Sequence, residues 1–440
     1  MLYQAPRGTQ DILPADRPYW RYVTGQMHAV AALFGYQQID PPIFEETALF
    51  VRGVGEGTDI VDKEMYSFQD KGGAEITLRP EFTAGVMRAY IENGMHVWPQ
   101  PVKLYSIGPI FRYERPQAGR FRQHHQFNVE AVGELDPAVD LEVMTVAWTL
   151  LTRLGYRGLS FQLNSTGCPV CRPAYRAKLV EYFRAYEDRL NEVDRRRLTI
   201  NPLRLLDSKE EAAQPLLNDA PHSADYLCDE CADHLARLRG YLETLQMPYA
   251  INFRLVRGLD YYTKTVFEIW AEGIGAQAAV CGGGRYDGLI EELGGPPTPG
   301  IGFGMGIERV ILSLKEQGIA APALPMPRVQ ISPLGDAARN AAVRLTYDLR
   351  TAGVGALLAF GDRSLKSQLK SANKADVAYT VILGDQELAS GVVVVRDMAG
   401  GEQTNVPLSG VIDWLRGRLS RSRFAPARSV IGRVTDPPGA

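Results

Sequence analysis

The spacing of apolar residues predicts an amphipathic helix near the start of the chain. The apolar positions recur at intervals of three and four: Trp20, Val23, Met27, Val30 and Phe34. This interval places them on one face of a helix that packs against other parts of the protein. Asp16 stands where a helix cap is expected, and Gly35 marks the end.

Strands follow this helix. Three stretches alternate or run apolar: EITLRP (75–80), VKLYSIG (102–108) and QFNVEAVG (126–133). Their lengths suit a largely antiparallel sheet. Strand character returns over 252–270 and again before Gly282, and a helix is expected over 305–314. These patterns predict an α+β body in two parts, 1–135 and 247–320.

Helical, charge-rich sequence separates the two parts. Residues 136–246 include runs such as EDRLNEVDRRRL, which do not fit a sheet core, so we expect a mostly helical insertion. A Pro/Ala stretch at 320–327 is the clearest linker. Beyond it, strands alternate with helices over 328–420, which predicts a small α/β domain with a mostly parallel sheet. Residues 421–440 are expected to be a disordered tail.

Composition indicates an ordinary globular protein of about two or three domains, with 440 residues, 45% hydrophobic and 22% charged. No run of eighteen apolar residues and no secretory signal pattern is present, so a cytoplasmic protein without membrane contact is expected. The net charge of −3 conceals an asymmetry, because residues 325–440 carry 15 Lys and Arg against 10 Asp and Glu. A basic terminal module suits contact with a phosphate backbone, although imbalances of this size are common on solvated surfaces.

Three arginines in separate motifs indicate a site for a polyanion. Arg112 lies in FRYE, Arg257 in RGLDYY and Arg309 in GFGMGIER, and folding can bring them together. Glu114 lies two residues after Arg112, so both point to one face of a strand, where they suit a phosphate and an exocyclic amine. Salt bridges within the protein are the alternative for each arginine. An enzyme that uses ATP is the leading hypothesis.

Polar side chains also alternate along QFNVE. Gln126, Asn128 and Glu130 share one face of this strand, as in a lined pocket or the solvent side of a sheet. In TLRPEFTAG, Glu81 and Thr83 are spaced to hold an ammonium group together, and capping of the following helix by Thr83 is a nearly equal alternative.

Basic residues gather in two further places. The loop ERPQAGRFRQHH carries Arg115, Arg120 and Arg122 and suits contact with a triphosphate or RNA. In the terminal domain, the basic positions fall on one helix face: Arg363, Lys366, Lys370 and Lys374. This stripe is either an RNA contact or a solvated face. The run GGGRYDGL at 282–289 is not a phosphate-binding loop, because the Lys-Ser/Thr ending is missing.

Four of the five cysteines form two CxxC pairs, Cys168 with Cys171 and Cys228 with Cys231. The spacing is permitted for structural zinc. However, the intervening segment is long and helical, so reduced thiols are favoured over zinc and no metal ligand is assigned. Cys281 is expected to serve packing.

Together these motifs resemble the histidyl-tRNA synthetase family of class II aminoacyl-tRNA synthetases over about residues 1–420. The matching segments are RGTQDILP, PPIFEETALFVRGVGE, FRYERPQAGRFRQ, GFGMGIER, and the pair RGLDYYTKTVFE with GGGRYDGL. The resemblance implies a catalytic domain in two parts around the insertion, built on an antiparallel sheet flanked by helices, and an anticodon-binding domain at 328–420. It also implies a homodimer, ATP with Mg²⁺, L-histidine and tRNA(His).

The resemblance further implies site roles. Arg257 and Arg112 would be catalytic at the α-phosphate. The histidine-binding set would be Glu81, Phe82, Thr83, Gln126, Glu130, Tyr261, Tyr262, Tyr286 and Gly304. ATP would contact Arg112, Glu114, Arg120, His124, Arg257 and Arg309. The tRNA would contact Arg115, Arg122, Arg363, Lys366 and Lys370.

Two departures from the family pattern stand out. His124 occupies a position where the family commonly has Phe stacked on adenine, and the insertion keeps only two CxxC pairs. The alternative function is a synthetase-like regulatory subunit of histidine biosynthesis. Such paralogues typically lack the terminal domain and lose parts of the arginine motif, both of which this chain retains.

Overall fold

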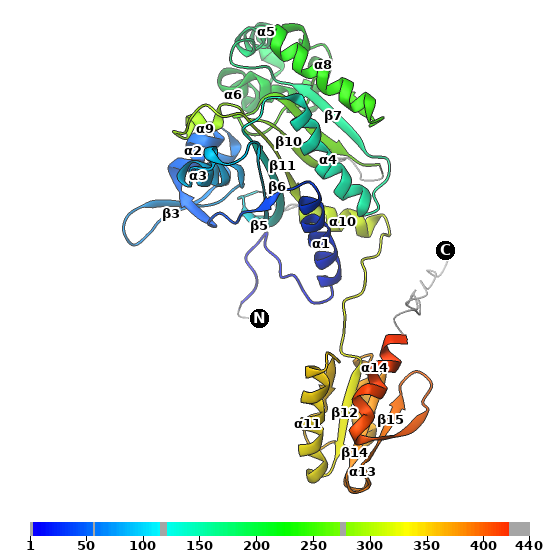
Figure 1. The fold of residues 1–440 in the computed structure, drawn as a ribbon. Coiled ribbons are helices and arrows are strands. Elements are labelled where there is room, and N and C mark those ends of the chain that lie inside the picture. Colours follow the sequence, from blue (N-terminus) through cyan, green and yellow to red (C-terminus); the bar gives the residue numbers. More distant parts are fainter. Residues whose placement is uncertain (1–2, 56–57, 115–120, 273–278, 422–440) are drawn as a thin grey trace, which may run out of the picture. The chain divides into compact units, whose positions relative to one another are not determined.

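The computed structural model describes residues 3–55, 58–114, 121–272 and 279–421. It divides into two compact units, Met1–Pro322 and Ala323–Ala440 (Figure 1). The predicted tail lies outside the described residues, apart from Arg421. Among the described helices, none combines the length and apolar character needed to cross a membrane.

An eight-stranded sheet forms the centre of the first unit. Its inner strands pair antiparallel, while the edge pairs β1/β5 and β7/β8 are parallel. The strand order is β1 (Gln37–Gln38), β5 (Val102–Phe111), β6 (Gln123–Val132), β11 (Gly300–Gly306), β10 (Ala279–Arg285), β9 (Thr263–Trp270), β7 (Ser160–Ser165) and β8 (Tyr249–Ile251). The predicted α+β class with an antiparallel sheet flanked by helices is confirmed.

Helices cover both faces of this sheet (Figure 1). One face packs against α1 (Arg17–Leu33), α4 (Pro137–Arg153), α8 (Asp229–Thr244) and α10 (Ile307–Glu316). The other carries α2 (Thr47–Val54), α3 (Thr83–Glu92) and α9 (Leu289–Glu292). Alternate residues of β6 point to opposite faces of the sheet, and Phe127 and Val129 lie in the core under α1.

The first helix forms as predicted, but its expected cap is wrong. Asp16 makes no capping hydrogen bond, and its carboxylate instead accepts a hydrogen bond from Lys315 Nζ at 2.7 Å. Pro18 occupies the second helical position, so one N–H that a capping side chain normally accepts from is missing. The last predicted helix of this body also begins later than expected, because β11 continues to Gly306 and holds Met305 as a strand residue.

Part of the expected insertion joins the main sheet. Within 136–246, α4 packs on the sheet and β7 pairs with β9. The helix α8 packs on the sheet as well, and the segment between β7 and α8 forms a helical cluster with its own core around Leu179 and Phe183. Its helices are α5 (Arg172–Arg184), α6 (Glu192–Ile200) and α7 (Gln214–Asn218). The short helices of the first unit are η1 (Ile60–Glu64), η2 (Met95–Val97), η3 (Glu187–Arg189), η4 (Pro202–Asp207), η5 (Glu211–Ala213) and η6 (Ser223–Tyr226).

A small antiparallel sheet lies beside α2, in the order β2 (Phe44–Glu46), β4 (Glu75–Leu78), β3 (Tyr66–Gln69). One of its faces is polar, where Thr77 Oγ1 hydrogen-bonds Thr47 and Ser67. Phe44 and Phe68 lie on the opposite face.

The second unit is an α/β domain with its own core. Strands β12, β13 and β14 are parallel, and β15 and β16 extend the sheet antiparallel. The order is β13 (Ala356–Leu358), β12 (Val329–Leu334), β14 (Tyr379–Gly384), β15 (Val392–Asp397) and β16 (Gln403–Pro407). Its helices are α11 (Asp336–Thr351), α12 (Leu365–Lys374), α13 (Asp385–Ser390), η7 (Leu408–Gly410) and α14 (Val411–Arg421).

Candidate active site

A hollow of about 500 Å³ opens over the central strands of the first unit. Cavities of about 300–1,000 Å³ are typical of small-molecule sites. Its lining is rich in polar groups, including Glu114, His124, Gln126, Arg257, Glu268, Glu308 and Arg309. These residues come from β6, β9, α10 and the connections between elements, so only the folded sheet assembles them.

Glycines make room for the side chains that cross this surface. A Cβ atom on Gly302 would collide with the Glu130 carboxylate, and one on Gly304 would collide with the Gln126 amide. On the neighbouring strand, a Cβ atom on Gly282 would collide with the Arg257 guanidinium. The glycines of β10 and β11 therefore leave room for the side chains that lie over them.

Arg257 and Arg112 are held close together beside the hollow. Arg257 Nη1 donates to Glu268 Oε1 at 2.7 Å, and Arg112 Nε donates to the Pro80 carbonyl at 2.8 Å. Burial lowers the pKa of Arg112, and the nearby positive charge of Arg257 acts in the same direction. Arg309, on the first turn of α10, lines the same hollow. The fold thus places two of the three predicted arginines on the hollow and the third near Arg257, an arrangement that can bind an anion.

Glu130 lies in a buried polar cluster behind the hollow, with 1% of its surface exposed. Its Oε1 accepts from Thr83 Oγ1 at 2.6 Å and Asn128 Nδ2 at 3.0 Å, and its Oε2 accepts from the Tyr286 hydroxyl. Burial raises the pKa of Glu130 to about 7. A carboxyl group with a strongly raised pKa beside a hollow is a candidate functional residue.

Glu81, not Thr83, caps helix α3. Its carboxylate oxygens accept from the backbone N–H groups of Thr83 and Ala84, each at 2.7 Å. The capping alternative for Thr83 is wrong, because its hydroxyl donates to Glu130 instead. Burial raises the pKa of Glu81. Two carboxylates thus lie on either side of one threonine.

Three tyrosines enclose this cluster. The ring centroids of Tyr261 lie 4.7 Å from Tyr262 and 5.8 Å from Tyr286. Burial raises the pKa of all three, so they remain neutral hydroxyl groups at neutral pH. Phe82 packs in the adjoining core with the Arg79 guanidinium 4.2 Å from its ring centroid.

The β5–β6 hairpin supplies the aromatic side of the hollow. His124 lines it, and burial, followed by the nearby charge of Arg112, lowers the pKa of His124 to about 4. The His125 ring packs edge-on against Trp20 of α1, with ring centroids 4.8 Å apart, and its backbone N–H and ring Nδ1 hydrogen-bond Glu308. Arg122 lies over the Tyr113 ring at 3.7 Å. Arg115 and Arg120 fall outside the described residues.

The structure adds residues that the sequence did not indicate. Asp207 and Lys209 come from the insertion and line the hollow. No spacing pattern links them to the sheet, so only the tertiary fold identifies them. Glu268, the partner of Arg257, had a detectable signal as a carboxylate inside the apolar strand β9.

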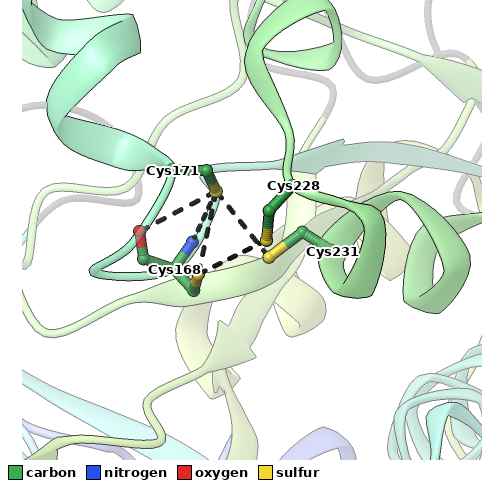
Figure 2. A group of neighbouring side chains, drawn as sticks. All are labelled: Cys168, Cys171, Cys228 and Cys231. Carbon is green, nitrogen blue, oxygen red and sulfur yellow. Dashed lines mark hydrogen bonds between the residues drawn. The ribbon is translucent and has the colours of Figure 1, made fainter.

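The four paired cysteines meet at one point, although 56 residues separate the two CxxC pairs. Figure 2 shows their sulfur atoms turned toward one another. The intervening segment forms the helical cluster and returns to the start of α8. Its length, which weighed against a shared site, does not separate the pairs.

The basic stripe of the second unit is exposed as expected for a helix surface. Arg363 precedes α12, and Lys366 and Lys370 project from it, while Gln368 and Ala372 are buried on the opposite side. Phe360, in the segment before α12, is 74% exposed.

Comparisons with known proteins agree along almost the whole chain. Residues 8–310 match the Histidyl-tRNA synthetase family model, and residues 328–418 match the Anticodon binding domain model. A histidine–tRNA ligase of Dehalococcoides mccartyi is 53% identical over 411 residues, which cover 93% of this chain and 98% of the relative. Another, from Pelotomaculum thermopropionicum, is 51% identical over 96% of this chain and 99% of its own length. The apo S. aureus histidyl-tRNA synthetase structure is 37% identical with a TM-score of 0.80, covering 94% of this chain and 99% of that one.

Proposed function

Because the chain belongs to the histidyl-tRNA synthetase family, we propose that it activates L-histidine with ATP and transfers the histidyl group to the 3′ end of tRNA(His). The observation that carries this proposal is the juxtaposition of a buried, hydrogen-bonded Glu130 with a polar hollow that Arg257 and Arg309 line. The first suits a small polar side chain, and the second suits a polyphosphate. The match of residues 328–418 to an anticodon-binding domain favours the synthetase over the regulatory subunit.

Activation needs no protein nucleophile. The histidine carboxylate attacks the α-phosphorus, the bond to the bridging oxygen of pyrophosphate breaks, and pyrophosphate leaves. Arg257 and Arg112 stabilise the negative charge that develops on the α-phosphoryl oxygens, with Arg112 also contacting the substrate carboxylate. Glu268 holds Arg257 in place before ATP arrives, so little reorganisation is needed during the reaction.

Histidine binds over the polar cluster. Glu81, Thr83 and Gln126 receive its α-ammonium group, while Glu130 and Tyr262 bracket the imidazole. The walls are completed by Phe82, Tyr261, Tyr286 and Gly304. A side chain without ring N–H groups would leave the buried Glu130 unpaired, and sites of this kind discriminate by a factor on the order of 10⁴ without editing.

ATP occupies the hollow with its phosphates toward the arginines. Glu114 accepts from the adenine amino group, and His124 stacks on the ring as a neutral aromatic group. Arg309 contacts the γ-phosphate at the start of α10, and Arg120 also contacts ATP. Mg²⁺ enters bound to the phosphates as part of the substrate.

Transfer requires the tRNA to contact both units. The terminal ribose hydroxyl attacks the carbonyl carbon of the adenylate, and AMP leaves. Arg115 and Arg122 contact the acceptor end, and Arg363, Lys366 and Lys370 contact the anticodon region. Phe360 adds an exposed aromatic ring beside the stripe, a combination suited to unpaired bases.

The small sheet supports a homodimer. Phe44 is 55% exposed and Phe68 is 49% exposed, and both lie on its outer face with Ile76 and Leu78. Glu46 lies at the edge of this otherwise apolar face. Exposed apolar surface of this kind is unfavourable in water and suits a second copy of the chain. Replacing both phenylalanines with Glu is expected to convert the dimer to a monomer in sedimentation velocity, while Tyr347→Glu, at another exposed aromatic, leaves it intact. A wild-type monomer at micromolar concentration would contradict the dimer.

The deciding experiment is ATP–pyrophosphate exchange with each amino acid in turn, followed by tRNA charging. Exchange that depends on histidine alone, together with charging of tRNA(His), is the expected result. Absence of exchange from folded protein would favour the regulatory function. A cytoplasmic location is also inferred, since the substrates ATP and tRNA and five free thiols suit a reducing compartment.

A further inference from the structure

We propose that Cys168, Cys171, Cys228 and Cys231 bind one zinc ion as a structural tetrathiolate site. The sulfur atom of Cys168 lies 3.8 Å from the sulfur atoms of Cys171 and Cys228, and the sulfur atom of Cys171 lies 3.8 Å from that of Cys231. All four lie within 4.8 Å of one another. A tetrahedral ion with Zn–S bonds of about 2.3 Å separates its sulfurs by about 3.8 Å. The spacing thus matches a single ion at the centre (Figure 2).

Other occupants fit less well. A disulfide requires sulfur atoms about 2.05 Å apart, and the five cysteines are free thiols. A multi-iron cluster places iron and sulfide between its cysteines and needs a wider separation than these sulfurs have. Oxygen-preferring cations such as Mg²⁺ are poor matches for a set made only of thiolates.

Local backbone geometry shapes the first pair as a metal-binding turn. Gly167 has φ of +71°, and a Cβ atom there would lie 2.8 Å from Cys171 Sγ. The Cys168 N–H donates to Cys171 Sγ at 3.3 Å, a bond that favours a sulfur carrying negative charge. Cys171 and Cys228 each directly precede a helix, α5 and α8, whose N-terminus also stabilises a thiolate.

The two segments that carry the cysteine pairs, called here the first arm (167–172) and the second arm (228–231), both hydrogen-bond the segment 262–264. From the first arm, Arg172 donates to the Tyr262 carbonyl, and the Gly167 carbonyl accepts from Lys264 N at 2.9 Å. From the second, Glu230 Oε1 accepts from Lys264 Nζ at 2.7 Å. Lys264 has φ of +48°, which a residue other than glycine keeps only where its surroundings fix it.

Zinc would therefore link the two arms that position the Tyr262 backbone. This consequence rests on the proposed function, in which Tyr262 faces the imidazole; the metal site itself does not. The ion acts here through positioning and takes no part in the reaction.

The test is metal analysis of the full-length chain expressed with zinc and purified without chelator. One zinc per chain is expected, released when an organomercurial blocks the thiols. Cys171→Ser and Cys231→Ser should lose the zinc, while Cys281→Ser, a buried cysteine outside the cluster, should retain it. Near-zero zinc in the wild type, or zinc that persists in both cluster variants, overturns the proposal.

Cobalt substitution covers the possibility that the serine variants misfold. Wild-type protein stripped of zinc and titrated with Co²⁺ should show intense sulfur-to-cobalt charge-transfer bands and visible bands of a tetrahedral site, saturating at one equivalent. Absence of these bands overturns the site. Zinc-loaded protein that shows no pyrophosphate exchange would contradict the proposed function while leaving the metal site standing.

Discussion

The buried cluster around Glu130 and the exposed stripe on α12 differ in how far water reaches their charged groups. Glu130 is 1% exposed, and each of its oxygens has a fixed partner. Lys366 and Lys370 are exposed on α12. In the first region, desolvation makes each polar contact strong and specific; in the second, water and salt weaken each contact, so many must act together. In the proposed function, the fold places amino-acid selection where water is excluded and leaves polymer contact where it is not.

The largest effect is expected from Arg257→Ala, in the desolvated region. Adenylate formation should fall about 100- to 1,000-fold, because the side chain acts mainly on charge that develops in the transition state. Histidine affinity should change little. Pyrophosphate exchange and equilibrium histidine binding separate the two quantities. Arg237→Ala, which removes an exposed arginine paired with Asp136, is the matched control and should leave exchange unchanged. A near-normal rate of adenylate formation in Arg257→Ala would contradict the catalytic role of this residue.

Glu130→Gln should have the second-largest effect, and it should weaken histidine binding more than it slows the reaction. The amide keeps the shape but not the charge, so the KM for histidine should rise about 10- to 100-fold. Because Gln avoids the cost of burying a charge, the variant should fold at least as stably as the wild type. Unchanged histidine affinity would remove Glu130 from the pocket.

The pH dependence of stability tests the same residue. Burial raises the pKa of Glu130 from 4.5 to about 7, so the folded state binds more protons than the unfolded state between these values. The contribution of Glu130 to the free energy of unfolding therefore falls as pH rises through this window and is fully lost above the folded pKa. Thermal unfolding at about pH 5 and about pH 8 should show a smaller pH difference in Glu130→Gln than in the wild type. Equal differences would contradict the raised pKa.

A smaller effect is expected from the exposed stripe. Lys366→Ala with Lys370→Ala should raise the KM for tRNA several-fold and reduce the salt slope of binding by about 0.7–0.9 for each lysine that neutralises a phosphate. Pyrophosphate exchange should stay unchanged, because the first step involves no tRNA. Arg344→Ala, an exposed arginine on α11 of the same unit, should keep the wild-type slope. An unaltered slope in the double variant would leave the stripe as a solvated face.

The smallest effect is expected from His124→Phe, which restores the residue common in the family. Burial lowers the pKa of His124 to about 4, so its imidazole is neutral near pH 7, and in the proposed site a neutral ring is expected to stack much as Phe would. The KM for ATP should change by less than about threefold. The expectation would be wrong if the wild-type KM for ATP changed with pH near neutrality and that of the variant did not. His124 would then carry charge near neutral pH.

Sequence reasoning succeeded where a local pattern has a single tertiary outcome. The family assignment is confirmed, because the motifs around Arg112, Arg257 and Arg309 are contiguous and specific. The alternation of QFNVE separated Phe127 in the core from Glu130 in the polar cluster. It failed at Asp16, where Pro18 removes a capping partner. At Thr83 the sequence left capping open as an alternative, and only the structure excludes it, because the hydroxyl donates to Glu130, 47 residues away along the chain.

The sequence by itself determined the elements, the family and the identity of the charged side chains, because each depends on periodicity or on motifs within a few residues. Only the tertiary structure decided which groups share a site. Asp207 reaches the hollow from the insertion, the glycines of β10 and β11 prove to be clearances for particular side chains, and four cysteines meet across 56 residues. Contacts of this kind depend on how the chain folds back on itself, and burial then sets the pKa of the groups enclosed, which no local spacing encodes.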